Sequence, residues 1–398
     1  MSDGVRLTGV TGPGDLVAVV VPQGPALPGL IERIWASGAA FIPLDAGMPS
    51  DRLEALLEAA RPTHVVSEDG EVAVRRGNGG EPVDEDVALV VHTSGTGGRP
   101  KLAQFDRRAL ERAVASSAER LGATSEDAWL CCLPVAHVGG LLVILRAVLL
   151  GAQVTILPRA DVQVIGASSA AFTSVVPTIL RRLVDAGADL TGFRAILVGG
   201  SGLWPDERAR AERAGATLVE TYGLTESCGG VVYEGVPLAG TEVRLGPDDE
   251  VHLRGPTTMR GYRFDPAASV DAFTGDEWLR TGDAGAMHEG TLRIVGRLDD
   301  LIVSGGEKVW PDRVESALRE HPDVGDVAVS GRPDPEWGHR VVAWVVPRTG
   351  AAPVELDGLR RFASSTLAPH ELPREVAIID TIPRTPSGKV VRRRLRPD

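Results

Sequence analysis

The chain has 398 residues, of which 43% are hydrophobic and 24% charged, and these values predict a globular protein with two or three domains. Its net charge is -12 and no long basic run precedes the last few residues, which argues against a nucleic-acid-binding surface. The first ten residues show no signal peptide, and the apolar stretch 138–157 is broken by Arg146 and several glycines. That stretch predicts a buried helix followed by a strand and no membrane insertion. Three cysteines without a Cys-x-x-Cys pair favour a cytoplasmic location.

Short apolar runs alternate with helical patterns from about residue 16 to residue 222. Strands are expected at 15–21, 87–92, 193–200 and 216–223, and helices at 25–39, 106–122 and 205–215. Residues 172–187 predict a strand that leads into a helix, with Pro177 in its first turn. Such alternation predicts a mainly parallel sheet covered by helices. The charged, glycine-rich stretch 68–86 is expected to be a surface loop or hairpin.

The pattern changes after Gly230. Short alternating strands are expected at 241–245, 250–255 and 291–297, which indicates a β-rich layer attached to the α/β part. Beyond residues 296–306 lies an α+β unit of about 100 residues. Its expected helices are 311–321 and 355–367, and its expected strands are 325–331, 340–347 and 375–380. The predicted fold class is therefore α/β, with a β-rich subdomain and a small α+β C-terminal domain.

The stretch HTSGTGGRPK, residues 92–101, has the composition of a loop that binds phosphate. Hydroxyls can donate to an anion and glycines let backbone N–H groups approach it. The hydroxyls belong to Thr93, Ser94 and Thr96, and the glycines are Gly95, Gly97 and Gly98. The loop of P-loop NTPases does not fit, because Pro100 stands where its second glycine would fall and Leu102 where Ser or Thr would. An ordinary strand-to-helix turn is the alternative.

Seven segments together resemble, in order, the motifs of the adenylate-forming superfamily of acyl-CoA ligases, adenylation domains and luciferases. Residues 93–101 are similar to its phosphate loop. Residues 133–140 are similar to its Leu-Pro-x-x-His segment, residues 198–203 to its adenine loop and residues 221–226 to its Tyr-Gly-x-Thr-Glu motif. Residues 277–285 are similar to the Thr-Gly-Asp ribose motif, residues 296–311 to the hinge and residues 383–390 to the terminal lysine motif. The resemblance covers nearly the whole chain, and several motifs in one order are highly specific.

The resemblance implies a use of ATP, Mg²⁺ and coenzyme A. Glu226 would hold Mg²⁺, Thr225 would donate to the α-phosphate, and Lys389 would bridge the substrate carboxylate and the phosphate. The arginines beside Lys389 (Arg392, Arg393 and Arg394) are expected to be ordinary solvated tail residues. The remaining residues implied in ATP binding are Thr93, Ser94, Gly95, Thr96, Gly97, Gly98, Lys101, Gly200, Ser201, Tyr222, Gly223, Asp283 and Arg297.

The resemblance also implies an acyl pocket and a mobile C-terminal domain. The expected domains are 1–297 for AMP and acyl binding, 298–300 as hinge, and 301–398 as the mobile domain. Asp299 would be the pivot, and Gly305 and Gly306 would let coenzyme A pass close to the backbone. The pocket is assigned to His137, Val176, Pro177, Gly229 and Gly230, the two glycines leaving room for a ring.

Within the superfamily the chain is most similar to the bacterial o-succinylbenzoate–CoA ligases of menaquinone synthesis. Gly97 departs from the usual pattern because a second threonine is common there, and no cation is assigned to the substrate's second carboxylate. Alternatives are another aryl- or medium-chain acyl-CoA ligase and an enzyme that charges a carrier protein. A nucleotide-binding regulator without catalysis and a luciferase-type oxidase are rivals of other classes. The expected partners are a small carboxylic acid, ATP and coenzyme A, with a homodimer as an open option.

Overall fold

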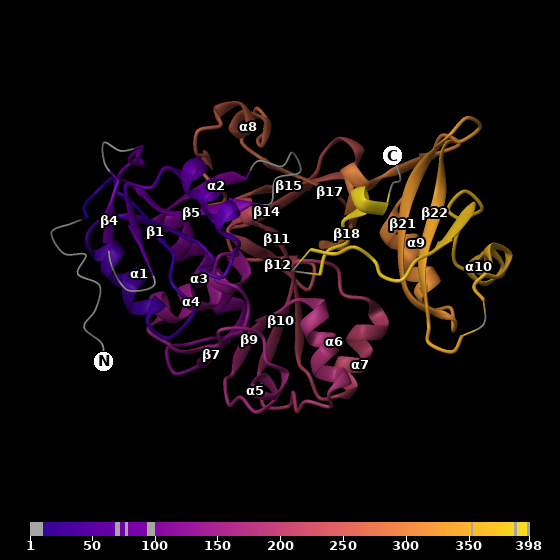
Figure 1. The fold of residues 1–398 in the computed structure, drawn as a ribbon, viewed down its shortest axis with the longest axis horizontal. Coiled ribbons are helices and arrows are strands. Elements are labelled where there is room, and N and C mark those ends of the chain that lie inside the picture. The colour runs from indigo at the N-terminus through magenta and orange to yellow at the C-terminus, as the bar shows by residue number, and fades with distance from the viewer. Residues whose placement is uncertain are drawn as a thin grey trace. The chain divides into compact units, whose positions relative to one another are not determined.

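The structure is a computed structural model, which describes residues 11–67, 72–75, 79–93, 100–351, 353–385 and 388–395. The chain forms two compact units. Unit 1 comprises Met1–Val243 and His252–Arg280, and unit 2 comprises Arg244–Val251 and Thr281–Asp398. Each unit is described by itself below, and Figure 1 colours the chain from its N-terminus to its C-terminus.

The first sheet of unit 1 has the strand order β16-β6-β5-β2-β1-β3-β4. Strands β1, β2, β3 and β5 are joined by parallel pairings, whereas β4, β6 and β16 are added by antiparallel pairings. The strands are β1 Leu16–Val19, β2 Ala40–Pro43, β3 His64–Val66, β4 Val72–Val74, β5 Val87–Thr93, β6 Lys101–Asp106 and β16 Gly261–Tyr262. The central strands are buried on both faces, as the near-continuous apolar sequence of β1 and β2 requires.

The second sheet of unit 1 has the order β13-β12-β11-β10-β9-β7-β8. Strands β7 to β11 are parallel, and β12 and β13 follow as an antiparallel edge. The strands are β7 Ala128–Cys131, β8 Gln153–Ile156, β9 Phe172–Val175, β10 Ala195–Val198, β11 Leu218–Leu224, β12 Gly229–Tyr233 and β13 Val236–Pro237. The buried side chains Ile196, Val198, Leu180 and Leu183 belong to one core cluster between this sheet and its helices.

The helices of unit 1 arise from apolar residues spaced three and four apart. In α1, for example, Leu27, Leu30, Ile31 and Ile34 are the buried residues. The carboxylate of Asp106 caps α3 by accepting from the N–H of Ala109 at 2.7 Å. The helices are α1 Leu27–Ala36, α2 Ser50–Ala60, α3 Arg107–Leu121, α4 Val138–Leu150, α5 Val162–Gly166, α6 Pro177–Asp185, α7 Pro205–Arg213, the 3₁₀ turn η1 Thr225–Ser227 and α8 Pro266–Asp271.

A third, four-stranded sheet has the order β14-β15-β17-β18. Its strands are β14 Glu242–Leu245, β15 Glu250–Arg254, β17 Leu279–His288 and β18 Thr291–Arg297, with the 3₁₀ turn η2 Pro247–Asp249 between the first two. This sheet contains the short strands expected after Gly230. The ten-residue strand β17, which carries the Thr-Gly-Asp motif, was not expected from the sequence.

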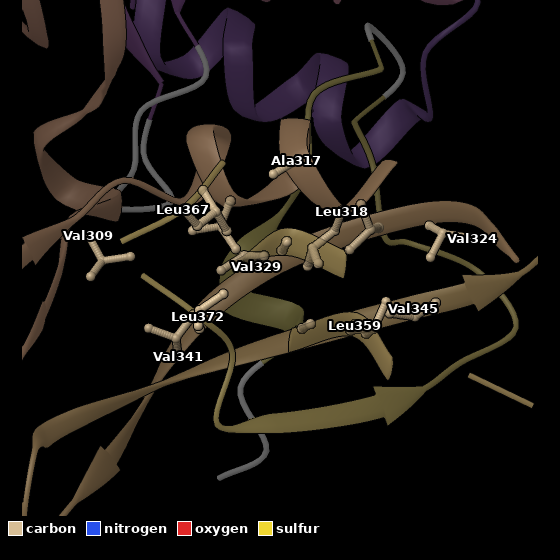
Figure 2. Packing of buried hydrophobic residues seen from close by; sticks show 14 of the residues in the cluster. Val309, Ala317, Leu318, Val324, Val329, Val341, Val345, Leu359, Leu367 and Leu372 are labelled. Carbon is tan, nitrogen blue, oxygen red and sulfur yellow. The ribbon is translucent and has the colours of Figure 1, made fainter. Parts of the chain in front are cut away.

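The C-terminal part of unit 2 is an α+β layer. Its sheet has the order β20-β19-β22-β21, and β23 pairs in parallel with β22. Helix α9 packs on β21, and the buried residues Leu318, Val324, Val329, Val341 and Leu359 belong to one core (Figure 2). The elements are η3 Leu298–Asp300, β19 Ile302–Ser304, β20 Glu307–Val309, α9 Pro311–Arg319, β21 Val324–Asp334, β22 Gly338–Pro347, α10 Leu356–Ala363, β23 Glu375–Ile378 and η4 Arg392–Leu395.

The expected α/β architecture is confirmed, although several strands were not expected and the boundary between the two parts differs. Strand β6 lies between the phosphate loop and α3, where the sequence analysis expected no strand. Residues 281–297 group with the C-terminal residues, so the expected hinge at 298–300 lies inside unit 2 as η3, and the hinge itself stays a prediction. Among the described residues, every helix is too short or too polar to cross a lipid bilayer.

Candidate active site

The carboxyl ends of four parallel strands bring the candidate residues of unit 1 to one edge of the second sheet. Strands β7, β9, β10 and β11 lie side by side and run in the same direction. In open parallel sheets this edge is where ligands bind. The residues that follow these four strands are His137 after β7, Val176 and Pro177 after β9, Gly200 and Ser201 after β10, and Tyr222 to Glu226 at the end of β11.

The turn that carries Thr225 and Glu226 is tightly specified. The hydroxyl of Ser227 accepts from the N–H of Leu224 at 2.9 Å and donates to the carbonyl of Gly229 at 2.9 Å. A Cβ at Gly223 would lie 1.9 Å from that same carbonyl, so only glycine fits there. The chain therefore turns sharply after β11 and leaves Thr225 and Glu226 partly exposed.

Tyr262 links two candidate phosphate-site residues that the sequence did not connect. Its hydroxyl donates to Oε1 of Glu226 at 2.7 Å, and Nζ of Lys101 lies 4.8 Å from the centre of its ring. Tyr262 pairs with Ala103 across β16 and β6, so Lys101 is its diagonal neighbour two residues along β6. Burial and then the charge of Glu226 raise the pKa of Tyr262, so its hydroxyl keeps the proton that it donates.

The ends of the phosphate loop are Thr93 and Lys101, which pair directly across β5 and β6. Both candidate residues therefore stand at the open end of a regular antiparallel ladder. The other candidates of this loop (Ser94, Gly95, Thr96, Gly97 and Gly98) lie outside the described residues. Their role stays a prediction.

His137 lies beside a second histidine, His92, which the sequence did not single out. The two ring centres are 5.6 Å apart and the rings are tilted. His92 is 6% exposed, and burial, with His137 and Arg52 adding to it, lowers its pKa to about 4. Burial also lowers the pKa of His137. Two neutral imidazoles thus face each other between the end of β5 and the start of α4.

Gln23 holds the segment before His137. Its side-chain amide donates to the carbonyls of Leu133 and Leu157, at 3.1 and 2.7 Å, and its Oε1 accepts from the N–H of Val135 at 3.0 Å. A half-buried amide that makes all three hydrogen bonds fixes the path of the chain. Gln23 is therefore a structural anchor for the Leu-Pro-x-x-His segment.

The two glycines assigned to the acyl pocket pack closely against other residues of the chain. A Cβ on Gly229 would lie 2.4 Å from Cδ1 of Leu142, and one on Gly230 would lie 3.1 Å from Thr221. A side chain at either position would therefore meet atoms of the protein, and the room for a ring that the sequence suggested stays a prediction. Their assignment to the pocket stays a prediction.

In unit 2, the ribose candidate Asp283 is paired with Arg297. The two residues are partners across β17 and β18, and Nη1 of Arg297 donates to Oδ1 of Asp283 at 2.9 Å. The same guanidinium donates to the carbonyl of Thr281 at 3.1 Å. The strand register thus brings together two candidates that lie 14 positions apart in the sequence.

The coenzyme A and hinge candidates of unit 2 lie on either side of β19. Asp299 is exposed in η3. Gly305 and Gly306 form the two-residue turn between the paired residues Ser304 and Glu307, with φ of 61° and 85°. Positive φ at both positions is the turn type that favours glycine.

Lys389 is exposed, but the backbone around it is ordered by its neighbours. The N–H of Lys389 donates to the hydroxyl of Thr385 at 3.1 Å, and the N–H of Thr385 donates to the carbonyl of Lys389 at 2.8 Å. Arg384 and Val390 form a bridge just outside this pair. The lysine therefore lies on a short hairpin-like segment, residues 383–391, of which residues 386 and 387 lie outside the described part of the chain.

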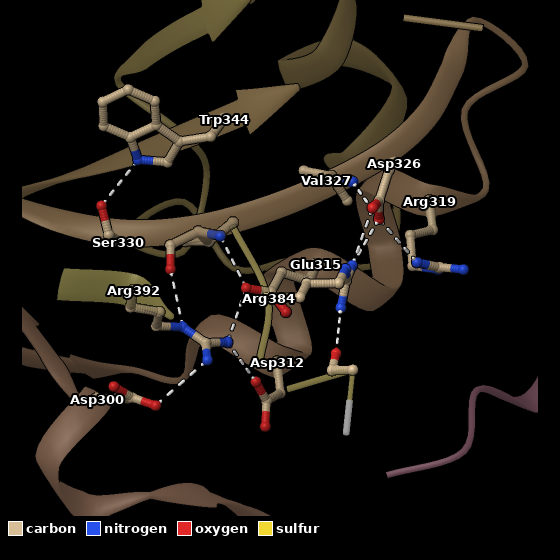
Figure 3. Close-up of polar contacts among 12 residues, drawn as sticks. Asp300, Asp312, Glu315, Arg319, Asp326, Val327, Ser330, Trp344, Arg384 and Arg392 are labelled. Carbon is tan, nitrogen blue, oxygen red and sulfur yellow. Dashed lines mark hydrogen bonds and ion pairs between the residues drawn. The ribbon is translucent and has the colours of Figure 1, made fainter. Parts of the chain in front are cut away.

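The expectation of a solvated tail is wrong for Arg392 and confirmed for Arg393 and Arg394. The side chain of Arg392 is 8% exposed, whereas the other two residues are exposed. Arg392 is surrounded by the carboxylates of Asp300, Asp312 and Glu315 (Figure 3). Burial raises the pKa of Glu315 to about 7, while Arg392 favours its charged form.

A sequence model described as AMP-binding enzyme matches residues 1–263, and one described as AMP-binding enzyme C-terminal domain matches residues 313–389. The chain belongs to the AMP-binding enzyme family. It is 38% identical over 329 residues to a probable 2-succinylbenzoate–CoA ligase of Mycobacterium tuberculosis, across 79% of this chain and 85% of that one. It is 33% identical to a 2-succinylbenzoate–CoA ligase of Listeria monocytogenes, across 78% of this chain and 69% of that one.

Solved structures agree with this family membership. A structure of o-succinylbenzoate CoA synthetase (MenE) from Bacillus subtilis with its acyl-adenylate intermediate has a TM-score of 0.83 and 26% identity, and covers 98% of this chain and 89% of that one. The same enzyme in complex with ATP and magnesium ion has a TM-score of 0.84 and 26% identity, and covers 98% of this chain and 90% of that one.

The residues present fit a Mg²⁺ ion that is shared with a nucleotide. Mg²⁺ is usually held by one or two carboxylates together with phosphate oxygens and water. Glu226 offers a partly exposed carboxylate of which one oxygen is held by Tyr262. In the described part of the chain no group of three or more His, Cys, Asp or Glu side chains could hold a metal. That Glu226 holds the ion stays a prediction.

Proposed function

We propose that the chain joins 2-succinylbenzoate to coenzyme A with consumption of ATP. The observation that carries the proposal is the grouping of Glu226, Tyr222 and His137 at one sheet edge in a chain that is 38% identical to a ligase of that name. The carboxylate of the acid attacks the α-phosphorus of ATP, and pyrophosphate leaves. The thiol of coenzyme A then attacks the carbonyl of the acyl-adenylate, AMP leaves and a proton is released.

The proposal gives each candidate residue of unit 1 a task in the first step. Two anions must meet, so the chain acts chiefly by positioning and by neutralising charge. Lys101 and the ends of the phosphate loop would contact the β- and γ-phosphates, and Thr225 would donate to the α-phosphate. Tyr222 would stack on adenine. Mg²⁺ held at Glu226 would supply further positive charge beside the phosphates.

The candidate residues of unit 2 act on the ribose, the carboxylate and the thiol. Asp283, oriented by Arg297, would accept from the ribose hydroxyls. The ammonium of Lys389 would stabilise the negative charge that develops while the acyl–phosphate bond forms. Movement about Asp299 would then replace Lys389 by the turn at Gly305 and Gly306, past which the pantetheine arm of coenzyme A would run.

A panel assay tests the substrate. Release of AMP and loss of the free thiol of coenzyme A are measured with 2-succinylbenzoate, benzoates and fatty acids of increasing length. A clear preference for 2-succinylbenzoate is expected. Equal turnover of another aryl or medium-chain acid would overturn the narrow assignment and leave the ligase chemistry standing.

Two further arms separate the rival functions. ATP–pyrophosphate exchange that is absent with every acid would indicate a nucleotide-binding protein without catalysis. Turnover with a phosphopantetheine-bearing carrier protein, but not with free coenzyme A, would indicate a carrier-loading enzyme. We place the reaction in the cytoplasm, which suits the three buried, unpaired cysteines.

A further inference from the structure

We propose that Arg384 and Arg392 are positioning residues that hold the two ends of the Lys389 segment, and that Arg392 ties this segment to η3. The inference rests on the proposed function, because it concerns the lysine that would serve the first half-reaction. All residues involved belong to unit 2.

Arg384 holds the end of the segment that precedes Lys389. Its Nη2 donates to both carboxylate oxygens of Asp326, at 3.0 and 2.9 Å, and its Nη1 donates to the carbonyl of Gly388 at 3.0 Å (Figure 3). One rigid guanidinium thus connects β21 to the residue directly before Lys389. A lysine at position 384 has no planar fork and could not make both contacts in this geometry.

Arg392 holds the other end from a buried site. Its Nη2 donates to Asp312 at 2.6 Å and to Glu315 at 2.7 Å, and its Nε donates to the carbonyl of Val329 at 3.1 Å. Glu315 also accepts from the N–H of Val329 at 2.7 Å. The anchor is therefore shared by α9, β21 and η4, and it lies three residues after Lys389.

The third carboxylate of this cluster connects the segment to the expected hinge. Nη1 of Arg392 donates to Oδ2 of Asp300 at 3.2 Å, and Asp300 directly follows Asp299 in η3. Through Arg392, the Lys389 segment and η3 therefore meet at one ionic cluster, although Lys389 and Asp299 are 90 positions apart in the sequence. A turn of the chain at Asp299 would move Asp300, Arg392 and the Lys389 segment together.

This arrangement fixes the backbone of Lys389 and leaves its side chain exposed. When the Cα of a long side chain is held in place, the ammonium has fewer orientations to begin with. It therefore loses less conformational entropy when it contacts the substrate. The two arginines would therefore act on the first half-reaction through Lys389, without touching the substrate themselves.

The test compares Arg384→Met, Arg384→Lys and Asp300→Asn with Arg332→Met as the matched control. Arg332 also lies on β21, and it pairs with Glu375 on β23. ATP–pyrophosphate exchange with 2-succinylbenzoate and thioester formation from preformed adenylate are measured separately. We expect exchange to fall by roughly 10- to 100-fold in Arg384→Met and less in the other two, with the thioester step and the control near wild type.

A second readout does not depend on activity. Hydrogen exchange at the amides of Thr385, Lys389 and Val391 should become faster in Arg384→Met and Asp300→Asn, because these amides close the segment. Arg384→Met in a Lys389→Ala background should lower exchange of pyrophosphate no further than Lys389→Ala alone. An additive loss would show that Arg384 acts elsewhere.

Several outcomes would overturn the proposal. Equal losses in both half-reactions would make the arginines merely structural, and faster amide exchange with an unchanged first half-reaction would show that the lysine needs no support. Arg392→Met would leave the buried carboxylate of Glu315 without its cation and can unfold the unit. Asp300→Asn removes only the contact of Arg392 with η3, so it tests the proposal in a folded protein. If the wild-type chain activates no acid, the proposed function fails, while the amide-exchange result still decides whether the arginines hold the segment.

Discussion

The two lysines expected to meet phosphate are supported in opposite ways. Lys101 extends from a regular β-strand and its ammonium lies over the ring of Tyr262, whose hydroxyl serves Glu226. Lys389 has an exposed side chain, and its support consists of charged pairs behind its backbone. An aromatic ring thus positions the ammonium of Lys101, whereas ion pairs position the backbone of Lys389. The proposed function accounts for this difference, because Lys101 would stay in place, whereas Lys389 would move with its segment and so would need a firm backbone and a free side-chain end.

The largest effect is expected when the side chain of Lys389 is removed. Lys389→Ala should lower adenylate formation by about 100- to 1,000-fold, since it removes one preorganised charge from the transition state. Thioester formation from preformed adenylate should be spared. Separate assays of the two half-reactions check this, with the exposed Arg393→Ala as control. Equal loss in both steps by a folded variant would contradict the division of labour.

Because the buried imidazole of His92 beside His137 is neutral, the stability of unit 1 should fall at acid pH. The folded-state pKa of His92 is about 4, below the unfolded value of 6.5, so the unfolded chain takes up its proton first as the pH falls. Its contribution to stability is present above pH 6.5 and is lost as the pH falls towards 4, by about 3 kcal/mol at most. Burial is the largest cause of the lowered pKa, and His137 and Arg52 add to it.

Urea unfolding at pH 7.5, 6 and 5 measures this effect. His92→Gln should flatten the decline in the free energy of unfolding relative to the wild-type chain. Parallel pH profiles for the two proteins would show that His92 does not titrate as a buried neutral group.

Tyr262 offers a way to separate its two contacts. Tyr262→Phe keeps the ring under Lys101 and removes the proton given to Glu226, so the KM for ATP at limiting Mg²⁺ should rise roughly 10-fold, as expected for a hydrogen bond to a charged group. Tyr262→Leu also removes the ring and should add about threefold, the size of an exposed cation–π contact. Mn²⁺ binding followed by electron paramagnetic resonance, with ATP present, gives a readout independent of turnover.

Tyr233→Phe is the matched control for these variants. It removes a buried hydroxyl that contacts Ser117 and Arg146, so it should lower stability but leave Mn²⁺ binding unchanged. Identical behaviour of Tyr262→Phe and Tyr233→Phe would mean that Tyr262 serves only the fold.

The smallest effect is expected at Gly97. A hydroxyl is common at this position in similar loops, so Gly97→Thr should be tolerated and should lower the KM for ATP slightly. Steady-state kinetics at saturating acid and coenzyme A measure it. A large rise in the KM for ATP would refute the idea that the loop relies on backbone amides there.

The sequence predicted the elements whose patterns are local, and missed contacts that depend on register. The helix that begins at Pro177 and the strand that contains Tyr222 follow from spacing and turn residues, and the structure has them. The contact of Tyr262 with Glu226 joins residues 36 positions apart through a two-residue strand, which no periodicity could indicate. Arg392 looked like a solvated cation because its three carboxylate partners are 77 to 92 positions away.

The glycines at 229 and 230 show a different limit of sequence reasoning. A missing side chain indicates that something comes close, but it does not say what. Here Leu142 fills the space beside Gly229. A motif can therefore indicate the approximate location of a site, whereas the packing of the fold determines which atoms are in contact there.

The pairing of Thr93 with Lys101 has a consequence for the side of the sheet on which Lys101 lies. Because Thr93 and Lys101 are paired residues of β5 and β6, the register of this ladder decides where both side chains stand. A slip of the ladder by one residue would turn Lys101 to the opposite face, away from Tyr262. One strand register therefore keeps the ammonium of Lys101 and the ring of Tyr262 on the same side of the sheet.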